Sequence, residues 1–114
     1  MDFEMCEVTQ AGRVELGRVV VAARATCGQT NWEDFADYLS EVSQYEIRKD
    51  ALWKVAEGNY SRTPSLTIVY ALLQLPEFRL ADGRPMDLDL IMSILSGKLN
   101  AEGSALEASH RNPG

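Results

Sequence analysis

Apolar residues recur along this chain at intervals of three and four, the spacing of amphipathic helices. Five such segments follow one another, at about 13–26, 30–42, 47–57, 64–75 and 86–96. The residues that this spacing turns inward are Leu16, Val19, Val20, Ala23, Trp32, Phe35, Ala36, Leu39, Val42, Ile47, Ala51, Leu52, Val55, Leu66, Val69, Tyr70, Leu72, Leu73, Leu88, Ile91, Met92 and Leu95. Three consecutive valines would also suit a strand, but no second strand-like run lies nearby to pair with it. The pattern therefore predicts an all-α domain of about five short helices.

Capping residues set the expected helix boundaries. Thr30 with Glu33, or Asn31 with Asp34, has the spacing of a capping box, in which a side-chain oxygen accepts from an unpaired backbone amide. Thr63 is an expected cap with Pro64 in the first helical position, and the expected stops are Gly28, Gly58, Pro76 and Gly97. With no repeat or internal boundary in sight, we expect an N-terminal segment at 1–12, one helical domain at 13–99 and a flexible tail at 100–114.

The chain of 114 residues is long enough for one domain with a modest core. Its longest apolar run, "VVVAA", is far too short to span a bilayer. The first residues, "MDFEMCEVTQ", lack the basic and then apolar order of a signal peptide. We therefore expect a cytoplasmic protein with no membrane segment.

The formal net charge of -6 is unevenly distributed. Residues 1–46 carry nine acids and three bases, and residues 63–114 carry six acids and four bases. Only the segment 47–62 is positive, with four bases against two acids. That segment fits a local contact with nucleic acid, although a solvated helix face has the same composition.

Few residues offer chemistry of their own. Cys6 and Cys27 have no CxxC spacing and are expected to be reduced thiols. Asp87 and Asp89 are two residues apart on a helix, so they point to different faces and do not make a metal pair. The one histidine, His110, lies in the predicted tail and completes no catalytic triad. The sequence therefore predicts no enzyme activity, metal or cofactor, and Trp32 and Trp53 are expected to pack in or around the core rather than stack on a ligand.

The stretch "IRKDALWKVAEGNYSRTPSL", residues 47–66, resembles the third helix and the start of the fourth in the Cro/CI-type (XRE) helix-turn-helix family. The matching positions are Ile47, Leu52, Val55, Gly58, Arg62, Pro64, Ser65 and Leu66. Upstream, "NWEDFADYL" resembles the second helix of that family and "LGRVVVAARATCG" resembles the first. The resemblance covers roughly residues 13–75 and implies a lambda-repressor-like fold.

The resemblance also implies a function and a set of contacts. The third helix of such domains enters the major groove of double-stranded DNA. By position, Arg48, Lys49, Asp50 and Ala51 would face bases, Lys54 a base or a phosphate, and Asn59 and Arg62 a phosphate. Backbone amides at Asn31 and Thr63 would hold phosphates at helix N-termini. The implied protein is a sequence-specific transcription regulator that acts as a homodimer on paired half-sites.

Alternatives remain open from the residues alone. The acidic total, and the absence of the family's usual glutamine near the start of the second helix, favour a helix-turn-helix module that binds a protein partner instead, as an anti-repressor or adaptor does. An antitoxin that binds both DNA and a basic toxin is a further alternative. The last helix offers a dimer surface at Ile91, Met92, Leu95 and Leu99, unless these residues pack on the core.

Overall fold

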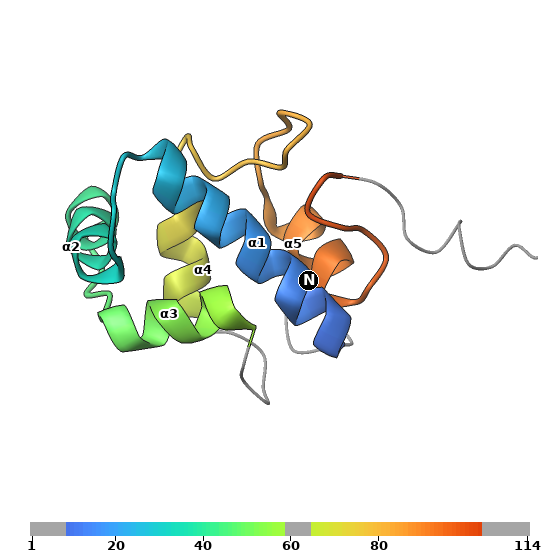
Figure 1. The fold of residues 1–114 in the computed structure, drawn as a ribbon, viewed down its shortest axis with the longest axis horizontal. Coiled ribbons are helices and arrows are strands. Elements are labelled where there is room, and N and C mark those ends of the chain that lie inside the picture. Colours follow the sequence, from blue (N-terminus) through green and yellow to red (C-terminus); the bar gives the residue numbers. More distant parts are fainter. Residues whose placement is uncertain (1–8, 59–64, 104–114) are drawn as a thin grey trace, which may run out of the picture.

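Five helices make up the regular secondary structure in a computed structural model of the chain, which describes residues 9–58 and 65–103 (Figure 1). In chain order they are α1 (Gln10–Thr26), α2 (Trp32–Ser43), α3 (Lys49–Glu57), α4 (Leu66–Leu73) and α5 (Leu88–Leu95). Within the described ranges the chain forms no strand, and its only strand-like pairing is an isolated bridge between Arg79 and Pro85. The prediction of an all-α domain with about five helices is confirmed.

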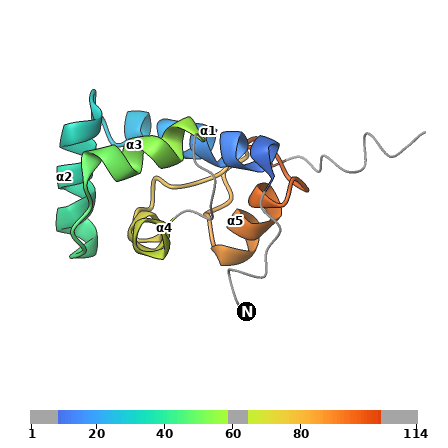
Figure 2. The same cartoon turned by 90° about the horizontal axis from the view of Figure 1, so that it is seen from below.

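Helix α1 is the central element, and its glycines allow two other helices to approach closely. It runs along the molecule from α5 at one end to α2 at the other, with α3 beside it (Figures 1 and 2). A Cβ atom at Gly12 would lie 2.6 Å from the carbonyl carbon of Leu95, and one at Gly17 would lie 2.8 Å from that of Ala56. Both helices therefore contact α1 backbone to backbone, a separation that only a glycine permits.

Side-chain caps fix where several helices begin. The Thr9 hydroxyl accepts from the Gly12 amide at 2.9 Å, so α1 begins at Gln10, three residues before the predicted start. Asn31 is the cap of α2: its side-chain oxygen accepts from the Asp34 amide at 2.8 Å. Asp87 caps α5 in the same way. The predicted cap at Thr63 and Pro64 lies outside the described residues.

Helix α3 ends as the sequence predicts. Gly58 adopts φ 69° and donates its amide to carbonyl groups of the last turn. This left-handed conformation favours glycine. The Gly58 backbone also lies close to Val14 of α1, so the residue both ends α3 and holds its last turn against α1.

The core confirms most of the predicted inward residues and corrects three of them. In α1, α2 and α3, most of the residues that were predicted to point inward are buried, and Val20, Phe35 and Leu52 are fully buried. Val42, Leu66 and Tyr70 were wrongly predicted to be buried, because each is about 40% exposed. In α4 the inner face is formed by Ile68, Val69, Ala71 and Leu72. The segment "LTIVYALL" is apolar on nearly every side, so its periodicity could not identify the buried face.

Irregular segments complete the core. The connection from α4 to α5, predicted as a loop, buries Phe78 and Leu80. Two residues at the start of the predicted tail lie against α1: the Ala101 amide donates to the Glu15 carboxylate at 2.8 Å, and Glu102 pairs with Arg18 at 2.6 Å. The remainder of the predicted tail lies outside the described residues.

None of the described helices combines the length and the apolar composition that crossing a bilayer requires.

Candidate functional site

The residues predicted to contact DNA lie around the beginning of α3 and the beginning of α2. Asn31, Arg48, Lys49, Asp50 and Lys54 are exposed. Ala51 is half-buried and packs against the core, so it is turned away from the surface that the others share. Asn59, Arg62 and Thr63 lie outside the described residues.

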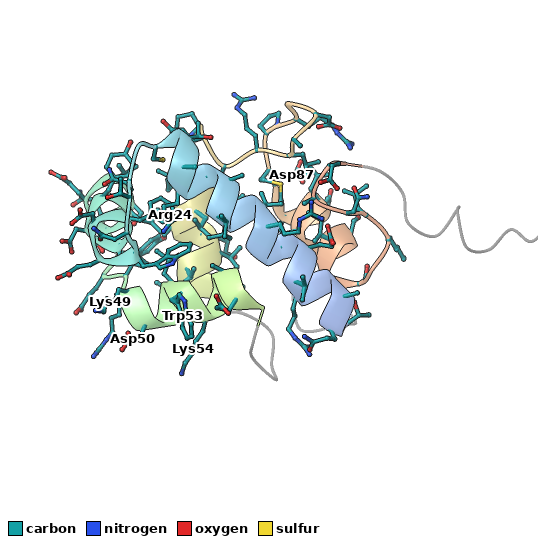
Figure 3. All side chains as sticks on the ribbon, viewed as in Figure 1. Arg24, Lys49, Asp50, Trp53, Lys54 and Asp87 are labelled. Atoms are coloured by element: carbon teal, nitrogen blue, oxygen red, sulfur yellow. The ribbon has the colours of Figure 1, made fainter. Side chains whose placement is uncertain are left out.

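The exposed residues of α3 form one stripe along the helix, which we call the outer stripe. Its members are Lys49, Asp50, Trp53, Lys54 and Glu57. Their spacing of one, three or four residues places them on one side of a helix. Lys49, Asp50 and Lys54 extend away from α1 (Figure 3), while Leu52 and Val55 on the opposite side are buried. The outer stripe holds two lysines and two acids, so its formal charge is zero.

The start of the outer stripe faces the start of α2 across a cleft of about 290 Å³. Six residues line it: Asn31, Trp32 and Glu33 from α2 and its cap, and Lys49, Asp50 and Trp53 from α3. Trp32 is half-buried and the other five are exposed, so the cleft opens to solvent. Its volume is just below the range of about 300–1,000 Å³ that is usual for small-molecule sites. The cleft is thus large enough for one side chain, and small for a cofactor.

Trp32 forms the fixed wall of this cleft. The guanidinium carbon of Arg24 lies 4.5 Å from the centre of the Trp32 ring, a cation–π contact from α1. On α2 itself the rings of Trp32 and Phe35 are 6.0 Å apart, and Phe35 is fully buried. Arg24 does not line the cleft, so its contact comes from outside. The indole is therefore held by both the core and α1.

Acidic side chains dominate the surface around the cleft. Helix α2 exposes a row that we call the acidic stripe, made of Glu33, Asp34, Asp37 and Glu41. From Asn31 to Glu57 the exposed residues include seven acids and three bases, a formal charge of -4. Within the described residues, Glu33, Lys49 and Asp50 form no salt bridge, so their charges are free to act on a ligand. The sequence had shown segment 47–62 as positive, but the fold places α2, with its acids, beside α3, which forms the described part of that segment.

The sequence-based prediction omitted three lining residues of the cleft: Trp32, Glu33 and Trp53. Trp53 was expected to pack in or around the core, yet it is 41% exposed. A signal for it was present, because Trp53 follows Lys49 by four residues and Leu52 by one. A helix that buries Leu52 turns Trp53 outward with Lys49. Nothing in the sequence indicated that Trp32 and Trp53 would lie across one cleft.

The candidate dimer surface on α5 is largely taken up by the core. Ile91 and Leu95 are 1% and 0% exposed. Met92 and Leu99 are half-buried and pack against the same core. Of the two interpretations that the sequence left open for these residues, the structure shows packing on the core. The homodimer stays a prediction, for which the described residues of α5 offer no surface.

A second cluster lies where α1 ends, next to α2 and the connection that follows α4. Burial and the neighbouring Glu77 carboxylate raise the pKa of the Cys27 thiol from 9.0 to about 11. The charge of Glu77, followed by burial, also raises the pKa of Tyr38. The thiol is therefore protonated near neutral pH and a weak nucleophile. In the described ranges no group of three or more His, Cys, Asp or Glu side chains is placed to hold a metal ion.

Comparison with known proteins yields no relative: no family model, no curated protein and no solved structure matches this chain. The resemblance to the Cro/CI-type family therefore rests on the quoted residues alone.

Proposed function

We propose that this protein is a helical interaction module, whose surface around α2 and α3 binds a positively charged segment of a protein partner. The observation that carries the proposal is the charge of α2, α3 and their connection. From Asn31 to Glu57, seven exposed residues are acids and three are bases. Complementary charge speeds the encounter of two proteins and excludes partners of the same sign.

The cleft supplies the second element that such a surface needs. Tryptophan is among the residues that contribute most to protein–protein interfaces, because it buries a large rigid area. Trp32 and Trp53 lie on the two sides of the cleft, within the acidic surroundings. An apolar centre with a charged rim is the usual organisation of a protein-binding site.

A sequence-specific DNA-binding regulator is the second candidate function. It is favoured by Arg48 at the N-cap of α3 and by Lys49 and Lys54 within the helix. All three are exposed, and the family resemblance implies that they contact bases or phosphates. DNA binding draws much of its affinity from neutralised phosphates. The acidic stripe beside these bases opposes that contribution, so the protein-binding function is the better supported of the two.

One pair of selections tests both candidates. The purified protein is used to select from a random peptide library and, separately, from random duplex DNA, each at low and at high salt. The proposal predicts peptides rich in Arg and Lys, with affinity that falls as salt rises, and no enriched duplex. An enriched two-fold-symmetric duplex site, without enriched peptides, would overturn the proposal and establish the regulator.

A further inference from the structure

We propose that the cleft between Trp32 and Trp53 binds one arginine side chain of the partner, with the guanidinium on the indoles and against the Glu33 and Asp50 carboxylates. This inference rests on the proposed function and names the group that the surface recognises. The cleft is the only described site that combines two tryptophans with two carboxylates.

The charge of the lining excludes other occupants. Glu33 and Asp50 outweigh Lys49, so the cleft has a formal charge of -1 within a surface of -4. A phosphate or carboxylate would meet two like charges there. A neutral apolar group would remove both carboxylates from water without pairing them, which costs free energy. A cation satisfies the carboxylates and is attracted to the indole faces.

The geometry favours arginine over lysine. A guanidinium is planar, stacks on aromatic rings and can donate two parallel hydrogen bonds to a carboxylate. A lysine ammonium is a compact and strongly hydrated point charge that gains less from a ring face. The molecule already contains such a contact, because the Arg24 guanidinium lies 4.5 Å from the centre of the Trp32 ring. Trp32 also lines the cleft, so the same indole is available there to a second guanidinium.

The cleft is also prepared for binding. Trp32 is held by Arg24 and by the buried Phe35. Trp53 lies on α3, which is anchored by the buried Leu52 and by the contact between Ala56 and Gly17. Walls that are already in place lower the entropy cost of ordering on binding.

Nuclear magnetic resonance of the two indole N–H groups provides a direct test. The chain has two tryptophans, and the variant Trp53→Phe assigns their signals. The full chain is titrated with N-acetyl-arginine amide, the matching lysine amide and the citrulline amide, which has the shape of arginine without its charge. The expected result is saturable shifts of both indole signals, strongest with arginine, weaker with lysine and absent with citrulline.

Two matched variants distinguish binding by the carboxylates of the cleft from attraction by the negative charge of the surrounding surface. Asp50→Asn removes a lining carboxylate and should weaken arginine binding about two- to fivefold, the range of one exposed ion pair. Asp37→Asn removes an equal charge from the acidic stripe outside the cleft and should change binding little. Equal losses in both variants, or equal shifts with citrulline, would overturn the arginine site. So would stronger binding of adenosine monophosphate, which would identify a base-stacking cleft.

Failure of the arginine site can be distinguished from failure of the proposed protein-binding function. If basic peptides are selected but arginine amide leaves the indole signals unmoved, the surface binds its partner without this cleft, and only the inference fails. If no basic peptide is selected and a duplex is enriched, the proposed function itself fails.

Discussion

The carbonyl group of Ala56 occupies the position that a side chain at Gly17 would need, so a Cβ atom there would lie 2.8 Å from the carbonyl carbon. This contact joins the middle of α1 to the last turn of α3. It sets the distance between the two helix backbones and therefore the position of α3 relative to the core. Because the cleft depends on where α3 lies, Gly17 supports the candidate site from the opposite side of that helix.

Replacing Gly17 with Ala should therefore destabilise the fold. In an exposed helix the change would stabilise the protein by about 1 kcal/mol through helix propensity. Here the added methyl group forces α1 and α3 apart, and overpacking of this kind costs about 1–3 kcal/mol or more. Chemical denaturation measures the free energy of unfolding. The variant Ala22→Gly, at an exposed position of α1, reports the propensity term alone. A Gly17→Ala protein more stable than the parent would contradict the contact.

Two leucines, one buried in α3 and one exposed at the start of α4, test the described core. Leu52 is fully buried, and Leu52→Ala should lower the free energy of unfolding by about 2–5 kcal/mol. Leu66 is 41% exposed at the start of α4, and Leu66→Ala should cost well under half as much. Thermal melting of both variants makes the comparison. Equal losses would mean that the described burial of one of these residues is wrong.

Reversing the charge of Lys49 should separate the two candidate functions. Lys49 is exposed and makes no salt bridge with a described residue, so Lys49→Glu should change stability by no more than about 0.5 kcal/mol. It should strengthen the binding of selected basic peptides, since it adds a carboxylate to the cleft. Binding to DNA would instead be weakened or lost.

Lys98→Glu is the matched control for that experiment. It changes the net charge by the same amount at an exposed position after α5, outside the cleft. An effect of Lys49→Glu on binding that exceeds that of Lys98→Glu places the ligand at α3. Loss of peptide binding in Lys49→Glu would contradict the proposed function.

The Cys27 thiol should titrate well above its ordinary pKa. In the variant Cys6→Ser, the rate of alkylation should rise with pH toward a midpoint of about 11, instead of 9.0. Because the folded state keeps the proton longer than the unfolded state, stability should fall as pH rises between these values. Glu77→Gln removes the neighbouring charge and should lower the midpoint. A midpoint near 9.0 in the parent would show that Cys27 is more exposed than described.

The sequence predicted the candidate site in part, and particular residues show why. Asn31, Lys49 and Asp50 were predicted as DNA contacts, and the fold brings all three to one cleft. Ala51 was proposed with them, but a half-buried alanine against the core cannot reach a ligand beyond the outer stripe. The misplaced Leu66 and Tyr70 have a related cause, because helical periodicity gives relative directions around an axis and does not say which face the protein covers.

By itself, the sequence determined the helices and most of their inner faces, because capping residues and the spacing of apolar side chains act over a few neighbouring positions. It predicted the left-handed stop at Gly58 for the same reason, and it limited the cap of α2 to Thr30 or Asn31, of which the structure has Asn31. Only the tertiary structure decided the electrostatic character of the site. Charge acts through space, and the packing of α2 beside α3 adds the acids of the acidic stripe to a segment that is positive when it is read along the chain.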